Sequence, residues 1–174
     1  MTPTVALAST RPMYSIRRAT VDDAPTLSAL AARTFTETFG HLYPPQHLQD
    51  FLEESYTVER QRTILAHPDY AVWLLELDGE AVGHAAAGPC GLPHPDVKPG
   101  DGALTRLYLI QTQLSCGSGS RLPETALARL AQDGPRPLWL GVWADNFGAP
   151  RFYARAGPQK ARAFPFPVCR PTAP

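Results

Sequence analysis

The sequence predicts a mixed α/β domain in which strands and helices share one hydrophobic core. A chain of 174 residues with 44% hydrophobic residues can bury a single core of this kind. Segments with apolar residues at helical spacing alternate with short apolar runs typical of strands. Three such runs follow one another near the middle of the chain, which excludes a doubly wound parallel sheet. We expect one domain over residues 14–168, a disordered leader over residues 1–13 and a tail over residues 169–174.

The first part of the chain predicts one strand followed by three helices. Tyr14 to Ala19 has a short strand pattern, and Thr20 is a typical helix N-cap residue. The first helix is predicted from the spacing of Leu27, Leu30, Ala31 and Phe35. The second begins after Pro44 and Pro45, with Leu48, Phe51 and Leu52 on one face. The third begins at a Thr57 cap and continues through Ile64 and Leu65.

The middle of the chain predicts a β-hairpin, a long loop and a third strand. Strands are expected over Ala71 to Leu77 and Ala81 to Gly88, because Asp78-Gly79 between them is a hairpin turn signal. A loop rich in Pro and Gly follows from Gly88 to Gly102. The apolar run Ala103 to Ile110 then predicts the third strand.

The last part of the chain predicts two helices, each followed by a strand. Arg121 to Gln132 has helical spacing, and Leu138 to Trp143 is apolar on both faces, as expected for a buried central strand. Asn146 to Ala156 fits a short helix. Lys160 to Val168 predicts a final strand, and its two prolines favour a position at the edge of the sheet.

A loop of small residues connects the third strand to the helix at Arg121. It consists of Ser115, Cys116, Gly117, Ser118, Gly119 and Ser120. A strand that turns through such a loop into a helix N-terminus offers free backbone N–H groups and the positive end of a helix dipole, which together can hold a pyrophosphate. The loop therefore indicates a cofactor that contains a nucleotide, although a flexible Gly/Ser connection fits the same residues.

Composition and charge exclude several classes of function. The formal net charge is zero and the Lys and Arg residues are scattered, which argues against a nucleic-acid partner. No apolar run resembles a membrane span or a signal peptide, so we expect a cytoplasmic protein. The three cysteines lack the pairing of a metal site, and Cys90, His94 and Asp96 offer too few ligands for zinc. No metal is therefore expected.

Three blocks in a fixed order resemble the GNAT superfamily, the GCN5-related N-acetyltransferases. The blocks are Ile16 to Ala24, then Leu104 to Leu109 ahead of Gly117 and Gly119, then Leu138 to Val142 leading to Asn146, Phe152, Tyr153 and Gly157. The resemblance covers about Ile16 to Phe166. It implies the GNAT (acyl-CoA N-acyltransferase) fold, a mixed and mostly antiparallel central sheet flanked by helices. It also implies transfer of an acetyl group from acetyl-CoA to an amine.

The resemblance further implies where acetyl-CoA binds. Leu107, Tyr108 and Leu109 would pair with the pantetheine amides like an added strand, and a backbone N–H near Leu109 would stabilise the thioester oxygen. The loop from Ser115 to Ser120 would surround the pyrophosphate. Asn146 would bind the pantetheine arm, and Tyr153 would protonate the leaving thiolate. Considered alone, Asn146 also fits a helix N-cap, and Tyr153 also fits an ordinary core position.

The chain departs from the family pattern at several positions. Leu114 and Cys116 lack the usual polar or glycine contacts to the pyrophosphate, and Pro158 stands where Phe is usual. Ala103 stands where many relatives have a glutamate associated with the base that deprotonates the amine. The remaining candidates for that base are Asp101, Glu37, His84 and His94, and the sequence does not rank them.

Two functions follow from these residues. The first is an acetyl-CoA-dependent N-acetyltransferase that acts on a primary amine of a small molecule or of a protein. Glu37, near the helices that line the acceptor site in relatives, would suit a cationic amine such as a polyamine. The second is a decayed relative that binds CoA or a protein partner without catalysis. Because relatives continue into a seventh strand, we also expect either a homodimer that covers the sheet edge or a mobile tail.

Overall fold

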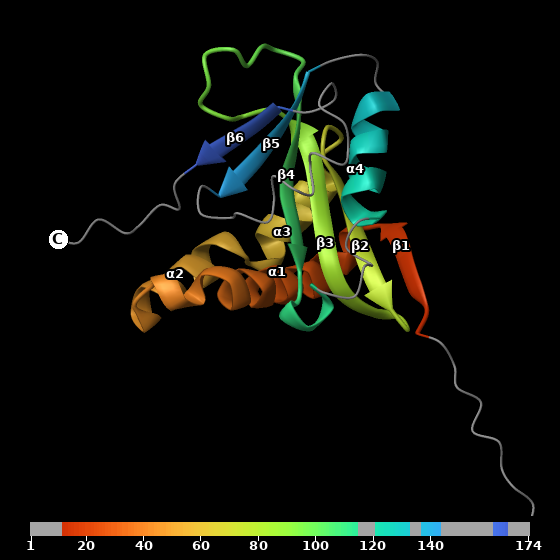
Figure 1. The fold of residues 1–174 in the computed structure, drawn as a ribbon. Helices are drawn as coiled ribbons and strands as arrows, with labels where there is room; N and C mark the ends of the chain where they lie inside the picture. The colour runs from red at the N-terminus through yellow and green to blue at the C-terminus, as the bar shows by residue number, and fades with distance from the viewer. Residues whose placement is uncertain (1–11, 115–120, 133–136, 144–161, 167–174) are drawn as a thin grey trace, which may run out of the picture.

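A computed structural model of the chain describes residues 12–114, 121–132, 137–143 and 162–166 (Figure 1). Within these residues the chain forms a six-stranded sheet and four α-helices. The strands are β1 (Tyr14–Arg18), β2 (Ala71–Leu77), β3 (Glu80–Pro89), β4 (Gly102–Leu109), β5 (Leu138–Trp143) and β6 (Arg162–Phe166). The helices are α1 (Ala24–Phe39), α2 (Pro45–Ser55), α3 (Val58–Ala66) and α4 (Arg121–Gln132). Short 3-10 turns lie at Val21–Asp23, Gly40–Leu42 and Gln111–Gln113.

The sheet is mixed, and its strands lie in the order of the sequence from β1 to β6. Strands β1 to β4 pair antiparallel, whereas β4, β5 and β6 pair parallel. The β2–β3 hairpin turns at Asp78 and Gly79, whose φ angles are 51° and 87°. Two successive positive φ values define the turn that matches the twist of paired strands, which confirms the predicted hairpin signal.

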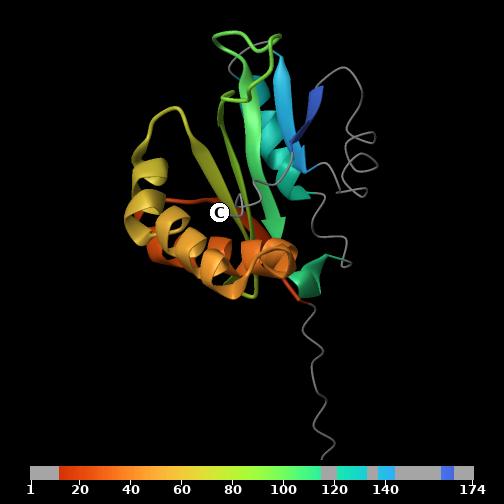
Figure 2. The ribbon, with the colours of Figure 1, turned by 90° about the vertical axis from the view of Figure 1, so that its left-hand side faces the viewer.

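Helices cover both faces of the sheet. Figure 2 shows α1, α2 and α3 on one side of the sheet and α4 on the other. The core between these layers includes the completely buried Leu74 of β2 and Leu122 of α4. The four residues that predicted α1 are all buried, as their spacing required: Leu27, Leu30, Ala31 and Phe35. The predicted mixed sheet flanked by helices is therefore confirmed.

The predicted helix starts are also visible as hydrogen bonds. The Thr57 hydroxyl oxygen accepts a hydrogen bond from the Arg60 N–H at 3.2 Å, which caps α3. The Thr20 N–H donates to the Asp23 carboxylate at 2.8 Å and opens the 3-10 turn before α1. Pro123 is the third residue of α4, where its missing N–H costs no hydrogen bond within the helix.

The final strand of the described sheet is β6, which pairs with β5 at the sheet edge. This position agrees with the prolines that favoured an edge strand. Outside the described residues lie the predicted helix over Asn146 to Ala156, most of the predicted leader and the predicted tail over residues 169–174. The predicted homodimer therefore remains a prediction. Among the described helices, none is both long enough and apolar enough to cross a membrane.

Candidate functional site

Strands β4 and β5 pair over only part of their lengths, and the end of this pairing is the first feature of the site. Their parallel pairing runs over three positions and ends at Leu104 opposite Leu140. Beyond Leu104, β4 continues beside β3, whereas β5 turns away and pairs with β6 (Figure 1). Side-chain burial changes at the same point, because β4 is fully buried up to Leu104 and largely half-buried afterwards.

A β-bulge marks the residue at which β4 leaves β5. In the β3–β4 ladder Ala86 lies opposite Arg106, but the next residue, Ala87, lies opposite Leu104. Thr105 is therefore the extra residue of β4, and its hydroxyl donates to the Ala86 carbonyl at 3.1 Å. A bulge bends its strand and increases the local twist. We infer that the bulge at Thr105 directs the second half of β4 away from β5.

Backbone groups of Leu107 and Leu109 point to the side of β4 that β5 has left. The Ile110 N–H donates to the Val82 carbonyl at 2.9 Å, so Ile110 directs its backbone groups toward β3. These directions alternate along an antiparallel strand. Tyr108 therefore faces β3, whereas Leu109 and Leu107 face away from it. In the described part of the chain, no strand pairs with this edge, which we call the open edge of β4.

Glycine on the neighbouring strand allows Leu109 to pack closely. Gly83 lies opposite Leu109 in the ladder, and a Cβ added to Gly83 would overlap the Leu109 Cδ2 methyl group. Any larger residue at Gly83 would have to displace the Leu109 side chain. The glycine therefore leaves room for the Leu109 side chain on the neighbouring strand.

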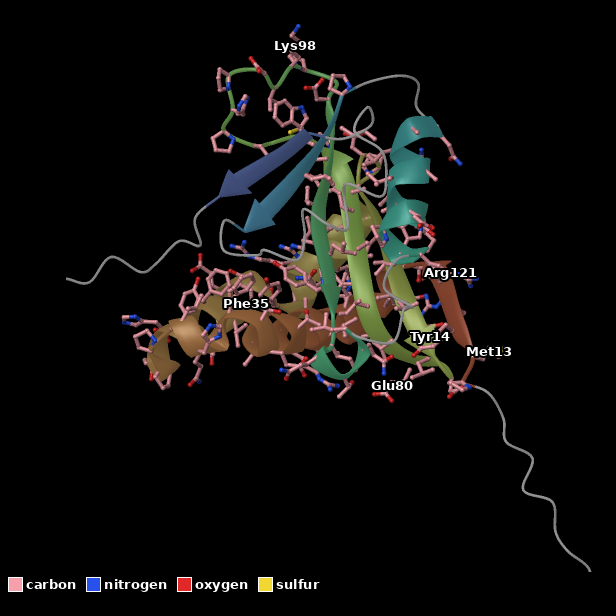
Figure 3. All side chains as sticks on the ribbon, in the orientation of Figure 1. Met13, Tyr14, Phe35, Glu80, Lys98 and Arg121 are labelled. Carbon is pink, nitrogen blue, oxygen red and sulfur yellow. The ribbon has the colours of Figure 1, made fainter. Side chains whose placement is uncertain are left out.

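An aromatic cluster from α1, α2 and the residue that follows α2 packs against the face of β4 that these helices cover. Phe35 of α1, labelled in Figure 3, lies with its ring centroid 4.8 Å from that of Phe51 and 5.7 Å from that of Tyr56. The Phe39 ring meets Tyr108 of β4 edge-on at 6.3 Å. The Arg106 guanidinium lies over the Tyr56 ring at 5.4 Å, a cation–π contact. Arg106 is thus held on the helix-covered face, next to the open edge.

A cavity of about 250 Å³ lies between α1, α3 and strands β2 to β4. Two completely buried polar side chains, His84 of β3 and Gln61 of α3, form part of its wall. Among the described residues, neither ring nitrogen of His84 and neither amide atom of Gln61 has a hydrogen-bond partner. Burial, reinforced by the Arg106 charge, lowers the pKa of His84 to about 3. His84 is therefore neutral in the folded protein near pH 7.

Glu37, a candidate base, lies just beyond the C-terminal end of β4. Its carboxylate accepts hydrogen bonds from the Arg33 side chain at 2.9 Å and from the Gln111 N–H at 2.6 Å. The hydrogen bond from Arg33, followed by that from Gln111, lowers the pKa of Glu37. Both carboxylate oxygens are therefore engaged, and Glu37 connects α1 to the turn that follows β4.

Asp101, the other catalytic candidate, lies at the opposite end of β4. Its carboxylate accepts hydrogen bonds from the Trp139 indole N–H at 2.8 Å and from the Lys98 N–H at 3.0 Å. Figure 3 shows Lys98 at the end of the molecule away from Phe35. The carboxylate thus connects the Pro/Gly-rich loop to β5, in the part of the sheet where β4 and β5 are still paired.

His94 and Ala103 lie at this same closed end. The His94 ring packs 4.9 Å from the Trp139 ring, and its Nδ1 accepts a hydrogen bond from the Asp96 N–H at 3.1 Å. Ala103 is buried opposite Trp139. In the described part of the chain, no group of three His, Cys, Asp or Glu side chains is placed to hold a metal ion. The candidate bases are thus distributed over both ends of β4 and one of its faces.

The other predicted acetyl-CoA contacts lie outside the described residues. These are the loop residues Ser115, Cys116, Gly117, Ser118, Gly119 and Ser120, together with Asn146 and Tyr153. The structure does confirm the elements that flank the loop, because β4 ends at Leu109 and α4 begins at Arg121.

Three residues of the site were not singled out by the sequence analysis: Thr105, Arg106 and Gln61. Arg106 had a usable signal, because it is the only charged residue in the apolar run Ala103 to Ile110. Gln61 had a weaker one, because it lies three residues from both Val58 and Ile64 on the apolar face of α3. Thr105 had none, because a bulge depends on pairing with a distant strand.

Comparison with known sequences finds one matching family. The family model described as "Acetyltransferase (GNAT) family" matches residues 33–157. An uncharacterized N-acetyltransferase of Lactobacillus delbrueckii subsp. lactis is 30% identical over 135 residues, which are 78% of this chain and 78% of that protein. An uncharacterized N-acetyltransferase of Mycobacterium tuberculosis is 33% identical over 135 residues, 78% of this chain and 82% of the relative.

Comparison with solved structures confirms the expected fold. The PaiA N-acetyltransferase of Thermoplasma acidophilum, solved in complex with coenzyme A, superimposes with a TM-score of 0.69. The match covers 83% of this chain and 89% of that chain, at 19% sequence identity. At so low a sequence identity, the match shows that the two proteins share a fold.

Proposed function

This chain belongs to the GNAT family of acetyltransferases, and from that premise we propose that it transfers the acetyl group of acetyl-CoA to a primary amine. The observation that carries the proposal is the open edge of β4, where Leu107 and Leu109 direct their backbone groups away from β3. Pantetheine is a linear chain with two amides, so it can pair with such an edge as an added strand would. The similar PaiA enzyme was solved with coenzyme A, which supports the same ligand here.

The open edge also suits the chemistry of acetyl transfer. A neutral amine attacks the thioester carbonyl carbon, and negative charge develops on the carbonyl oxygen. In this proposal the Leu109 N–H, at the end of the open edge, stabilises that charge. When the carbon–sulfur bond breaks, Tyr153 supplies a proton to the thiolate in this proposal. The attacking nitrogen loses its own proton to a base or to water.

A second function, binding without catalysis, is favoured by one observation. Glu37 and Asp101, the two carboxylates expected to act as bases, already accept hydrogen bonds from neighbouring groups. The same bonds weaken the case for a polyamine acceptor, because the Glu37 carboxylate is paired with Arg33. The acceptor in the first proposal is therefore a primary amine of a small molecule or of a protein, without a requirement for added positive charge.

A turnover assay separates these two functions. We expect the full-length protein to release free CoA thiol from acetyl-CoA when amines are added as a panel of amino acids, monoamines, polyamines and peptides. Mass spectrometry should show the acetylated amine in the same amount as the thiol released. Acetyl-CoA binding without amine-dependent thiol release from any member of the panel would support binding without catalysis instead.

A further inference from the structure

The cavity between α1, α3 and the sheet contains more unpaired hydrogen-bonding capacity than a structural core normally tolerates. His84 is 1% exposed and Gln61 is 0% exposed, and among the described residues their four polar side-chain atoms lack partners. A buried donor or acceptor without a partner destabilises the fold, because it has lost its hydrogen bonds to water without replacing them. Two such side chains in the wall of one cavity indicate a polar ligand that supplies their missing hydrogen bonds.

The character of these groups restricts the ligand's chemistry. His84 is neutral, so its ring offers one N–H donor and one acceptor nitrogen. The Gln61 amide offers donors and an acceptor, and neither group carries charge. The remaining wall is largely apolar, with Leu27, Ile64 and Val72 among its residues. The inner part of the cavity therefore suits a neutral group that both donates and accepts hydrogen bonds.

The outer part of the cavity is different because it carries a positive charge. Thr105 and Arg106 of β4 belong to the lining, and Thr105 is exposed whereas His84 and Gln61 are fully buried. The cavity therefore reaches the surface at β4. Among the described residues, no carboxylate forms an ion pair with Arg106, whose guanidinium lies over the Tyr56 ring. A guanidinium in this setting suits a carboxylate of the ligand.

The mouth of the cavity adjoins the open edge of β4. Arg106 directly precedes Leu107, the first residue that directs its backbone groups to the open edge. A ligand whose carboxylate rests on Arg106 can therefore place a neighbouring amine beside the thioester. The bulge at Thr105 lies at the same point, so the reactive edge and the cavity mouth meet where β4 leaves β5.

We propose that this cavity is the acceptor subsite and that the acceptor is a free amino acid with a neutral, hydrogen-bonding side chain. Arg106 holds the carboxylate, the side chain enters the cavity to reach His84 and Gln61, and the α-amine is acetylated at the open edge. A volume of about 250 Å³ leaves room for such a side chain. The inference rests on the proposed acetyl transfer and specifies its substrate. A polyamine is disfavoured, because Arg106 repels added positive charge.

Two matched pairs of amines test the inference by their kcat/KM values. L-Glutamine and its carboxamide, glutaminamide, differ only in the carboxylate, whereas L-glutamine and L-methionine have side chains of similar shape but different polarity. We expect wild type to prefer glutamine over glutaminamide by roughly 10- to 100-fold, as expected for hydrogen bonds between a carboxylate and a half-buried guanidinium. We expect it to prefer glutamine over methionine by roughly 10- to 100-fold, as expected for buried polar groups left unpaired.

Variants assign each preference to its residue. Arg106→Gln should remove the preference for the carboxylate, and Arg106→Lys should restore part of it. Gln61→Leu should remove most of the preference for glutamine over methionine while leaving the carboxylate preference. Arg60→Gln, which changes an exposed arginine on α3, is the matched control and should change neither ratio. Calorimetry should show that acetyl-CoA binds Arg106→Gln as well as wild type.

Several results would overturn the inference. Amine acetylation with equal rates for glutamine and glutaminamide, or faster with polyamines, would refute the subsite while leaving the proposed function intact. A parallel loss of acetyl-CoA affinity in Arg106→Gln would assign Arg106 to the acetyl-CoA site instead. Unchanged ratios in Gln61→Leu would mean that water alone fills the cavity. If no amine at all is acetylated, the proposed function fails, and this inference fails with it.

Discussion

Replacing Leu109 with proline is expected to lower kcat for acetyl transfer by roughly 100- to 1,000-fold, the usual effect of removing one backbone donor from an oxyanion site. Proline has no N–H, and the Leu109 N–H is the donor proposed to face the thioester oxygen. The sheet should remain folded, because the Leu109 N–H points away from β3 and takes no part in the β3–β4 ladder. Steady-state kinetics together with circular dichroism would measure both effects.

Two controls separate the backbone from the side chain. Leu109→Ala keeps the N–H and should retain turnover close to wild type. Tyr108→Pro removes an N–H that faces β3 and should disrupt the sheet instead of acting on turnover alone. Wild-type turnover in a folded Leu109→Pro variant would show that this N–H does not stabilise the transition state.

The stability of the protein should depend on pH through His84. Burial lowers the pKa of His84 in the folded protein to about 3, whereas an unfolded histidine titrates near 6.5. Between these values the unfolded chain binds more protons than the folded one, so unfolding becomes easier as the pH falls. His84 should therefore reduce the free energy of unfolding by about 2 kcal/mol between pH 7.5 and pH 5.0.

The variant His84→Leu provides the measurement. Chemical unfolding of wild type and variant at both pH values gives the difference in their unfolding free energies. That difference should shift in favour of the variant by about 2 kcal/mol at the lower pH. His41→Leu, which changes an exposed histidine in the turn after α1, is the control and should behave like wild type. If the unfolding free energies of wild type and His84→Leu depend on pH in the same way, then burial does not lower the pKa of His84 in the folded protein.

The helices and strands were largely predictable because their signals are local. Residues 121–132 and 138–143 form α4 and β5 with the predicted boundaries. Apolar spacing, a Thr57 cap and an Asp78-Gly79 turn each act over a few residues, so the sequence contains them directly. The resemblance to a known family supplied the overall fold, which periodicity alone left open.

The site was less predictable because its geometry depends on residues far apart in the sequence. The open edge exists because β5, about thirty residues after β4, pairs with it over only a short segment. The cavity is lined by His84 from the sheet and Gln61 from a helix. That their polar atoms lack hydrogen-bond partners can be recognised only after the sheet and the helix are packed together. The sequence did identify His84 and Glu37, but it could not show that one is buried and the other already bonded.

Amide hydrogen exchange, measured by NMR residue by residue, tests most directly whether the open edge of β4 binds acetyl-CoA. Without ligand, the Leu107 and Leu109 amides should exchange faster than the Tyr108 amide, because only Tyr108 faces β3. Added acetyl-CoA should slow exchange at Leu107 and Leu109 and leave Tyr108 unchanged. If acetyl-CoA binds but slows exchange at neither leucine, or if it does not bind at all, the open edge is not the acetyl-CoA site.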